Sequence, residues 1–391
     1  MSSVNILKSK FLLDPSVTYL NFGSFGACPK PVFERYQQLQ LELEREPVQF
    51  IAGNGIAYIK KSREALAEFC NCDAEDLVYV PNPTFAINII AKNLKLNADD
   101  EILSTNLEYG AMDRTWNYYC GLSKAKYIRQ HIELPLTDKE TFLENFWKGY
   151  SSKTKAIFIS QITSATGLIL PVKEICERAK ELNLLTIVDG AHVPGHVKLD
   201  LKELKADFFT GACHKWMMTP KGSSFLYVKK EFQSNLDPLI ISWGYESDFP
   251  SSSQFLDYHQ FNGTRDFSAY LVIPDAIDFM KENNWTNVAA DCRKLVKNNA
   301  ERFGELLETK LLSPVTDEFL GQMISLPIKT NTPELLQKKL FTDYKIEIPV
   351  MRQQSNIYIR YSINAFNSQN DLDNLFDALK QIKNSAGFNL K

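Results

Sequence analysis

The sequence has no apolar run close to the roughly 18 residues that suggest a membrane-spanning helix. Its 44 basic residues are balanced by 47 acidic ones, so it has no excess of positive charge for binding nucleic acid or an anionic membrane. The 7 cysteines in 391 residues are too few and too scattered to staple a secreted scaffold. Asp14 and Pro15 interrupt the first apolar stretch before it can form a signal sequence, and we therefore expect a cytoplasmic protein with reduced thiols.

The motifs of two common enzyme classes are also missing. A dinucleotide-binding turn needs Gly-x-Gly-x-x-Gly, and Gly53–Gly55 has no third glycine at the required spacing. His192 and His196 have the spacing of two zinc ligands on one helix face, but a proline and a glycine between them would break that helix. The sequence therefore predicts neither a dinucleotide-dependent enzyme nor a metal site.

Short apolar runs alternate with helical patterns through the first two thirds of the chain. The runs are rich in β-branched and aromatic residues, as are strands that are buried on both faces. Helical spacing of apolar residues between them is seen in Ala86–Leu94 and Val172–Leu182. This alternation predicts an α/β fold with a mostly parallel central sheet covered by helices. The expected strands are Leu77–Val80, Ile102–Ser104, Ala156–Ser160, Leu184–Val188, Asp207–Thr210 and Phe225–Val228.

The pattern changes after about residue 262, where longer helical stretches alternate with few strand-like runs. We expect an N-terminal arm over residues 1–15, a large α/β domain over residues 16–262 and a small C-terminal α+β domain over residues 263–391. The expected helices of the small domain are Tyr270–Asn283, Trp285–Leu311, Pro333–Thr342 and Gln369–Lys383, and its expected strands include Gly321–Leu326 and Asn356–Ser362.

An aspartate and a lysine follow two consecutive strands of the expected sheet. Asp189 comes directly after Leu184–Val188, and Lys215 follows the next strand along the chain. Ligands of parallel sheets bind outside the carboxyl ends of the strands, so both side chains are expected at one edge. A lysine amine can bond covalently to an aldehyde cofactor while an acid keeps a pyridine nitrogen protonated. The pair suggests pyridoxal 5′-phosphate, although each residue alone could be a turn former or a surface lysine.

Further motifs in the same order make the chain resemble a known family. Val188–His192 and Gly211–Trp216 resemble the class V aminotransferases, which are fold type I pyridoxal phosphate enzymes. The resemblance runs nearly from end to end, and the strings GTRD, HKW and ITSATGL look most like isopenicillin N epimerase-like proteins. It implies a fold type I aminotransferase architecture and an enzyme that acts at Cα of an amino acid. The other matching segments are Tyr19–Gly26, Asn82–Asn88, Ser160–Gly167, Asn262–Asp266 and Ile359–Ser362.

Several matching residues would hold the phosphate of the cofactor. Thr84 and the Phe85 amide would cradle it, because a helix that begins near Thr84 leaves free N–H groups for an anion. His214, next to the lysine, resembles a family histidine that hydrogen-bonds the phosphate. Thr264 matches a threonine that reaches the phosphate of a neighbouring subunit, which implies a homodimer with shared sites.

Other matches concern the ring of the cofactor. Tyr109 stands where relatives place an aromatic or histidine side chain over the ring face. Ser164 and His192 match positions near the phenolic oxygen, and Ser164 is shorter than the asparagine of desulfurase relatives. The catalytic residues implied are Lys215 as covalent anchor and general acid/base, Asp189 as partner of the ring nitrogen, and His192.

An arginine near the end of a strand in the small domain is the expected binder of the substrate. Arg360 can pair bidentately with the α-carboxylate of an amino acid, which a lysine cannot do as rigidly. Arg265 and Arg352 remain alternatives for this role. Asn21, within the N-terminal motif, is the second substrate-binding residue that the resemblance implies.

Reaction type and substrate side chain stay open, since transamination, epimerisation and β-elimination differ only in the orientation of bonds at Cα. A carbon–sulfur lyase or desulfurase-like enzyme is one alternative. The chain has no cysteine after Cys292, so the loop before Arg360 offers no acceptor for a persulfide. A catalytically inactive binding protein of the same fold is the other alternative, and the presence of Lys215 together with Asp189 argues against it.

Overall fold

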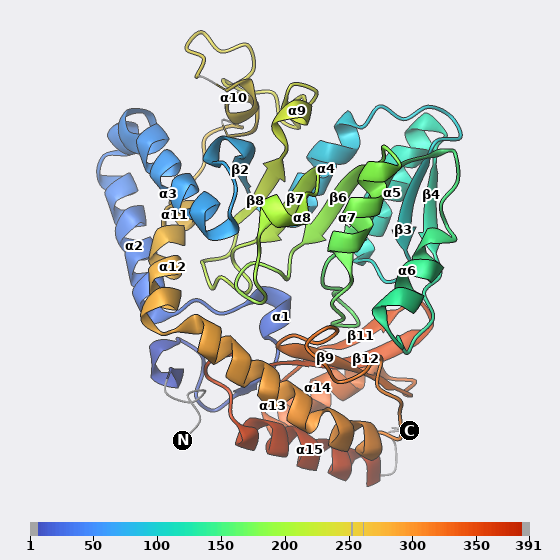
Figure 1. Cartoon of the computed structure of the whole chain (residues 1–391). Coiled ribbons are helices and arrows are strands. Elements are labelled where there is room, and N and C mark those ends of the chain that lie inside the picture. The colour runs from blue at the N-terminus through green and yellow to red at the C-terminus, as the bar shows by residue number, and fades with distance from the viewer. Residues whose placement is uncertain (1–6, 252, 261, 385–391) are drawn as a thin grey trace.

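A seven-stranded sheet forms the centre of the larger part of the molecule (Figure 1). The computed structural model describes residues 7–251, 253–260 and 262–384. The strand order is β2-β8-β7-β6-β5-β3-β4, in which the neighbours from β7 to β4 run parallel and β8 is antiparallel to β7 and β2. This confirms the mostly parallel α/β sheet. The strands are β2 (Leu77–Val80), β3 (Glu101–Thr105), β4 (Lys126–Gln130), β5 (Thr154–Ser160), β6 (Leu185–Gly190), β7 (Phe208–Ala212) and β8 (Ser224–Val228).

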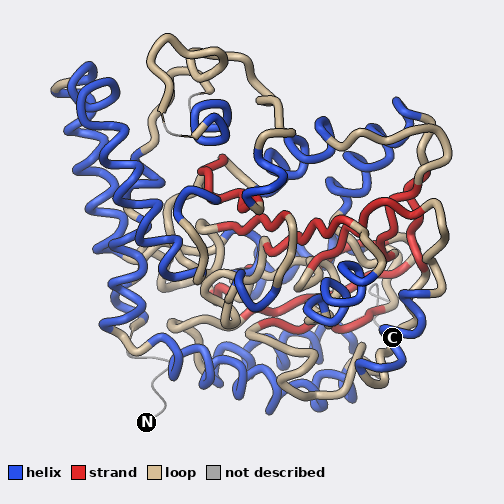
Figure 2. The backbone as a smooth tube through the Cα atoms, turned by 45° about the horizontal axis from the view of Figure 1, so that its top comes forward, coloured by secondary structure: helices blue, strands red, loops and turns tan. Residues whose placement is uncertain are grey.

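Helices cover both faces of this sheet, and Figure 2 shows the strands running through the middle of the molecule with helices around them. In β5, Ala156 and Phe158 pack with α4 and α5, whereas Ile157 and Ile159 pack with α7 in a second apolar cluster. Successive side chains of a strand point to opposite faces, so each β-rich run supplies both cores. The covering helices are α4 (Pro83–Asn93), α5 (Gly110–Ser123), α6 (Lys139–Trp147), α7 (Val172–Glu181) and α8 (Leu201–Leu204).

The edge strand β4 is absent from the strands that the sequence predicts. Its residues, KYIRQ, are exposed or half-buried throughout. The strand has a neighbour, β3, on one side only, so it needs no continuous apolar run and carries charged residues as edge strands commonly do.

A three-stranded antiparallel sheet with strand order β11-β12-β9 lies below the large sheet in Figure 1. Helices α13, α14 and α15 accompany it, and β10 pairs in parallel with β1 near the N-terminus. The division at residue 262 stays a prediction, and residues 1–6 of the expected arm lie outside the described residues. The elements are β1 (Thr18–Tyr19), β9 (Met323–Ile328), β10 (Ile346–Glu347), β11 (Val350–Gln353), β12 (Asn356–Ser362), α13 (Trp285–Leu306), α14 (Pro333–Tyr344) and α15 (Gln369–Asn384).

The helix expected over Tyr270–Asn283 is divided in two. Helix α11 ends at Leu271 and α12 begins at Ile273, with Pro274 in its first turn, where the missing N–H of proline costs nothing. Both helices pack against α2 and α3. None of the described helices has the length and apolar character of a membrane span. The remaining elements are α1 (Phe22–Phe25), α2 (Lys30–Arg45), α3 (Gly55–Cys70), α9 (Lys230–Gln233), α10 (Gln254–Gln260), α11 (Ser268–Leu271), α12 (Ile273–Glu282) and the short turns Lys8–Lys10, Gln49–Asn54 and Ala74–Asp76.

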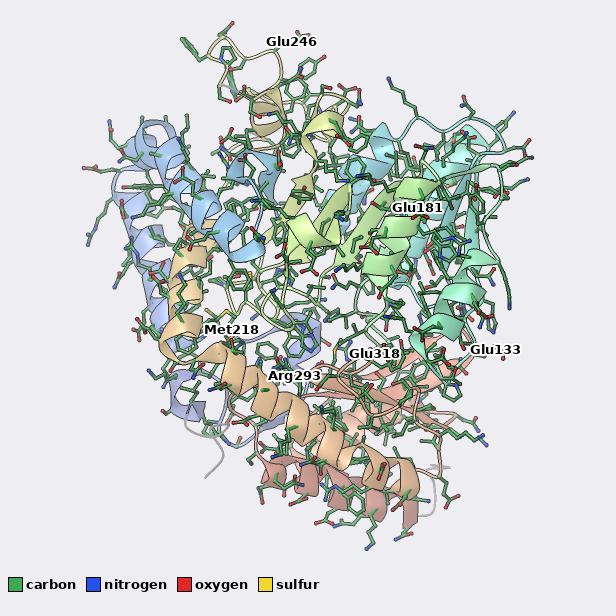
Figure 3. The ribbon with its side chains drawn as sticks, viewed as in Figure 1. Glu133, Glu181, Met218, Glu246, Arg293 and Glu318 are labelled. Carbon is green, nitrogen blue, oxygen red and sulfur yellow. The ribbon has the colours of Figure 1, made fainter. Side chains whose placement is uncertain are left out.

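Side chains fill the boundary between the loops of the large sheet and α13 (Figure 3). Met218, in the loop after β7, is fully buried. Arg293 on α13 donates a hydrogen bond to the carbonyl of His196 at 3.5 Å, and the Trp285 indole donates to the carbonyl of Gly195 at 3.2 Å. These two hydrogen bonds hold the loop that follows β6, the strand in which Asp189 lies.

Candidate active site

A cavity of about 360 Å³ lies between the carboxyl ends of β5 and β6, helix α1 and strand β12. The cavity unites residues from distant parts of the chain. Asn21, Phe85 and Thr264 are the predicted site residues that do not line it. The predicted site residues that do are Thr84, Tyr109, Ser164, Asp189, His192, His214, Lys215 and Arg360.

Parallel pairing of β6 and β7 positions the acid and the amine. Asp189 pairs in register with Thr210 near the end of β7, and Lys215 lies in the loop just beyond. One carboxylate oxygen of Asp189 accepts a hydrogen bond from the Ala191 N–H at 2.9 Å. Burial raises the pKa of Asp189, and the Ala191 hydrogen bond and the charge of Lys215 oppose that rise. The positive charge of Lys215 thus favours the ionised form of Asp189.

Lys215 contacts a histidine whose protonation can be inferred from its partners. The Trp216 indole N–H donates to His192 Nδ1 at 3.2 Å, and Lys215 Nζ lies 3.2 Å from His192 Nε2. Burial holds the pKa of His192 well below its usual value, so the ring is neutral and its single proton is on Nε2. A hydrogen bond from Nε2–H to Nζ requires the neutral amine. Burial lowers the pKa of Lys215 to about 8, which makes this nucleophilic form accessible near neutral pH.

Arg360 is buried beside the cavity without an acidic partner. It is 1% exposed, its Nη1 donates to the carbonyl of Ser164, and its Nη2 donates to Ser24 Oγ at 3.0 Å. Its Nε has no hydrogen-bond partner. Among the described residues, Arg360 takes part in no ion pair. Burial lowers the pKa of Arg360 to about 10. An uncompensated buried charge is costly, so this guanidinium is prepared for an anion that enters the cavity.

The N-terminal motif supports this arginine. Asn21 Oδ1 accepts a hydrogen bond from the Ser24 hydroxyl, and Ser24 in turn accepts from Arg360, so Asn21 acts through Ser24 and not on the cavity itself. A Cβ at Gly23 would lie 2.9 Å from Ser362 Oγ and 3.3 Å from Arg360 Nη2. Only glycine allows α1 this close approach to β12.

The N-terminus of α4 differs from the expectation at one residue. Asn82 caps the helix, and its Oδ1 accepts a hydrogen bond from the Phe85 amide at 2.9 Å. The Phe85 N–H is therefore already occupied and not free for a phosphate. Pro83 has no N–H, which leaves the amide and hydroxyl of Thr84 as the donors of this turn that line the cavity.

His214 also lines the cavity and is a second group that could bind an anion. Its Nδ1 donates to the carbonyl of Ser223 at 2.9 Å, which leaves Nε2 free. Burial lowers the pKa of His214 to about 4, so the ring is neutral without an anion. A phosphate beside Nε2 would raise that pKa again and convert the nitrogen into a donor.

Tyr109 and Thr264 are both exposed, but only Tyr109 lines the cavity. Tyr109 precedes α5 and is 48% exposed while lining the cavity. Thr264 is exposed between α10 and α11, outside the cavity. A single chain therefore does not bring Thr264 to the predicted phosphate position.

Glu108 is a buried acid at the site whose role the sequence did not indicate. Its carboxylate accepts hydrogen bonds from the Ser160 amide at 2.9 Å and hydroxyl at 2.5 Å, and from the Thr105 hydroxyl at 2.8 Å. These bonds tie the end of β3 to the end of β5, beside Asp189. Burial raises the pKa of Glu108 to about 8. The sequence signal that could have pointed to Glu108 was its position directly before Tyr109. The neighbouring residues do not show, however, whether an acidic side chain is buried or solvated.

These residues fit pyridoxal 5′-phosphate. The buried amine of Lys215 and the carboxylate of Asp189 line one cavity. Thr84 and His214 offer groups for an anion, and the unpaired Arg360 guanidinium remains for a second anion, as an amino-acid substrate would supply. No cluster of three or more His, Cys, Asp or Glu residues suited to a metal ion occurs in the described parts of the chain.

Comparison with known proteins places this geometry in context. Residues 28–375 match the model of the family described as aminotransferase class V. An isopenicillin N epimerase of Streptomyces clavuligerus is 33% identical over 387 residues, which cover 95% of this chain and 96% of that protein. An L-cysteine desulfhydrase of Arabidopsis thaliana is 26% identical, covering 94% of this chain and 88% of that protein.

Solved structures show the same fold at lower identity. The apo structure of a cysteine desulfurase from Thermococcus onnurineus superposes with a TM-score of 0.83 at 20% identity, covering 97% of this chain and 99% of that one. The cystine C–S lyase C-DES in complex with cysteine persulfide gives a TM-score of 0.80 at 20% identity, covering 94% and 98%. A C-DES variant is described with glycine covalently linked to its pyridoxal phosphate cofactor.

Proposed function

Because this chain belongs to the aminotransferase class V family of pyridoxal phosphate enzymes, we propose that the cavity beyond β6 and β7 holds the cofactor together with one α-amino acid. The observation that carries the proposal is the shared cavity of Lys215, Asp189 and an unpaired Arg360. When bound, pyridoxal phosphate withdraws electrons from Cα of the substrate, which makes a bond at that carbon easier to break.

Several residues of the chain have distinct proposed roles around this cofactor. Lys215, as the neutral amine, would hold the cofactor covalently by condensing with its aldehyde and releasing water, and once displaced by the substrate it would carry a proton to or from Cα. Asp189 keeps a proton on the pyridine nitrogen, and the Thr84 amide and hydroxyl with His214 bind the phosphate. His192 orients the amine through its Nε2 proton, which is fixed by the hydrogen bond from Trp216 to Nδ1.

Two further residues complete the proposed cofactor contacts. Tyr109 lines the cavity, and its ring would stack on the pyridine ring of the cofactor. Ser164 supplies a hydroxyl near the phenolic oxygen while its carbonyl holds Arg360. Arg360 then binds the α-carboxylate bidentately, and this orientation determines which bond at Cα is activated.

Epimerisation at Cα is the reaction that we favour. Two isopenicillin N epimerases, at 33% and 31% identity, are more similar to this chain than are the desulfhydrases at 24% to 26%. A carbon–sulfur lyase that needs no protein thiol is the second candidate, and the cysteine desulfhydrase relatives support it. No cysteine is found in the residues that line the cavity, which counts against a persulfide route. The cytoplasmic location expected from the sequence stays a prediction.

Exchange of the Cα hydrogen tests the proposal directly. We expect the holoenzyme in deuterated water to replace the Cα hydrogen of a suitable amino acid, because Lys215 transfers a proton at that carbon. Nuclear magnetic resonance of a panel of L- and D-amino acids would detect the exchange. Appearance of the opposite enantiomer identifies an epimerase, and release of sulfide identifies the lyase. Absence of exchange across the panel, with the cofactor bound, would contradict the proposal.

A homodimer with shared sites is supported by two features of the surface. Thr264 is exposed and lies outside the cavity of its own chain, as expected for a residue that serves the neighbouring subunit. Large apolar side chains are exposed on the loop between α9 and α10, where Trp243 is 87% and Phe249 is 92% exposed. Covering such side chains favours association.

Mixing two inactive variants tests the shared site. Lys215→Ala lacks the amine, and Thr264→Ala should bind the cofactor weakly. After mixing by unfolding and refolding, about a quarter of all sites should combine an intact Lys215 with an intact Thr264 from the other chain. Activity at limiting cofactor is therefore expected to recover to about a quarter of the wild-type value. If Thr264 served its own chain or no site at all, mixing would restore nothing beyond the activity of Thr264→Ala alone.

A further inference from the structure

His196 is a buried histidine in the turn after β6 to which the proposed function gives no role. It lies four residues after His192 and is 1% exposed. Its Nδ1 lies 3.0 Å from the carbonyl oxygen of His192, and its Nε2 accepts a hydrogen bond from the Gln322 N–H at 2.6 Å. Burial lowers the pKa of His196 to about 3, so the ring is neutral and carries one proton. Since Nε2 is an acceptor, this proton is on Nδ1 and is donated to the His192 carbonyl.

The ring of His196 also stacks on Trp216, the residue after Lys215. The two ring centroids are 3.9 Å apart, and the angle between the ring planes is 19°. Trp216 is fully buried, and its indole N–H donates to His192 Nδ1 at 3.2 Å. His196 therefore contacts both the backbone of His192 and the side chain that binds the His192 ring.

Hydrogen bonds connect the other edge of the His196 ring to the strand that carries Arg360. Gln322 directly precedes β9, and its side chain donates to the carbonyl of Ile363 at 3.1 Å. The Ile363 N–H donates back to the Gln322 carbonyl at 2.8 Å, and Ile363 directly follows β12. A Cβ at Gly321 would overlap the His196 imidazole, so glycine is needed for this close approach. A continuous set of hydrogen bonds thus runs from the end of β12 to His196.

The tautomer of His192 affects the protonation of the Lys215 amine. The Trp216 N–H occupies Nδ1 of His192, so the proton of the neutral ring is on Nε2 and faces Lys215 Nζ. A neutral amine accepts this hydrogen bond, whereas an ammonium group would face the Nε2 proton as a second donor. If Trp216 moved, His192 could carry its proton on Nδ1 and accept from the ammonium instead. The amine would then be harder to deprotonate.

We propose that His196 is a positioning residue that keeps the Nε2 proton of His192 directed at Lys215. Its Nδ1–H fixes the backbone of His192, its ring holds Trp216 in place, and the Gln322 N–H determines its tautomer. Because Gln322 adjoins β9, the environment of the amine depends on the position of the three-stranded sheet. The inference rests on the proposed function only in taking Lys215 as the reacting amine.

The pH dependence of cofactor attachment tests the inference. Full-length protein freed of cofactor would be mixed with pyridoxal phosphate at a series of pH values, trapped with borohydride and digested, and the Lys215 peptide would be quantified by mass spectrometry. In His196→Phe a ring can still stack on Trp216, but both hydrogen bonds are lost. We expect the midpoint of the profile to rise by about half a pH unit to one unit and attachment at pH 7 to slow about fivefold, because loss of a hydrogen bond to the neutral amine favours the ammonium.

The charged groups that act on Lys215 are unchanged in this variant. Asp189 on β6 raises the pKa of Lys215, and Arg360 on β12 lowers it. His214, the preceding residue, is neutral because burial lowers its pKa to about 4. A shifted midpoint therefore reports the hydrogen bond between His192 and Lys215.

Two conservative variants separate the contacts of His196. The amide of His196→Asn can replace Nδ1–H as donor to the His192 carbonyl, and this variant should recover most of the wild-type midpoint. The longer side chain of His196→Gln can reach the Gln322 N–H in place of Nε2 and should recover less. Recovery by His196→Gln alone would contradict the assigned contact with His192.

His259→Phe is the matched control. His259 on α10 is 2% exposed, hydrogen-bonds the carbonyl of Leu236 at 3.3 Å and does not line the cavity, so its loss should leave the midpoint unchanged. An unchanged midpoint in His196→Phe, or an equal shift in His259→Phe, would overturn the inference and leave the proposed function intact. Absence of label on Lys215 in the wild-type protein would instead contradict the proposed function.

Nuclear magnetic resonance of the wild-type protein, labelled with 15N at histidine, tests the same geometry without a substitution. The chain has 5 histidines, so the spectrum contains few signals. We expect two neutral rings of opposite tautomer at pH 7, with the proton of His196 on Nδ1 and the proton of His192 on Nε2. A charged His196 ring, or a proton on its Nε2, would overturn the inference.

Discussion

Replacement of Lys215 by alanine should abolish covalent attachment of the cofactor and lower turnover by about a thousandfold or more, because the variant loses both its nucleophile and its general acid/base. Wild-type protein reduced with borohydride and digested should carry the cofactor on the peptide that contains Lys215. The variant should carry none, although it can still hold the cofactor through Thr84, His214 and Asp189. Mass spectrometry of the peptides measures both outcomes.

Lys221 provides the matched control for this experiment. It is the neighbouring lysine in the same loop, and its Nζ donates to the carbonyl of Gly26 at 3.3 Å instead of lining the cavity. Lys221→Ala should therefore keep the label on Lys215. The rate of attachment in wild-type protein should rise as the pH increases through about 8, since burial lowers the pKa of Lys215 to about 8 and only the deprotonated amine reacts. Label found on Lys221, or attachment that slows with rising pH, would contradict the assignment.

Replacement of Arg360 by methionine should weaken the binding of amino acids about a hundredfold and leave cofactor binding nearly unchanged, because a bidentate charge-assisted pair is lost. The guanidinium has a free Nε and no acidic partner in the described chain, so it can pair with the α-carboxylate without giving up an ion pair. Titration of the variant with amino acids, followed by cofactor absorbance, measures the change.

The conservative variant separates recognition from simple positive charge. Arg360→Lys should recover only part of the affinity, since a lysine ammonium cannot match both carboxylate oxygens. Arg265→Met is the control, because Arg265 donates to the Tyr270 hydroxyl and does not line the cavity. Loss of the cofactor with retained amino-acid affinity in Arg360→Met would move the carboxylate site elsewhere.

Much of the large sheet was predictable, because a strand that is buried on both faces consists of an uninterrupted run of apolar residues. The runs Leu77–Val80 and Phe225–Val228 are apolar without interruption, and both form strands of the sheet. The edge strand β4 has no such apolar run, because its residues are exposed or half-buried. The expected helix Trp285–Leu311 ends at Leu306, and Glu308 just beyond adopts a positive φ of 50°.

Details of the site depended on hydrogen bonds that no local pattern encodes. The Phe85 amide was expected to face a phosphate, but the preceding Asn82 takes it as a helix cap. Asn is a good helix cap, and which N–H groups it occupies follows from the exact start of the helix. Similarly, Asn21 supports Arg360 through Ser24 instead of lining the cavity.

By itself the sequence determined the family, the parallel sheet and the placement of Asp189 and Lys215 near the carboxyl ends of adjacent strands. These properties follow from periodicity and from motifs that occupy a few consecutive residues. Only the tertiary structure decided that Arg360 is buried without a partner, that His192 presents its Nε2 proton to Lys215, and that His196 hydrogen-bonds the carbonyl of His192. The reason is distance along the chain. Arg360 meets Ser24 across 336 residues, a contact that no local sequence pattern encodes.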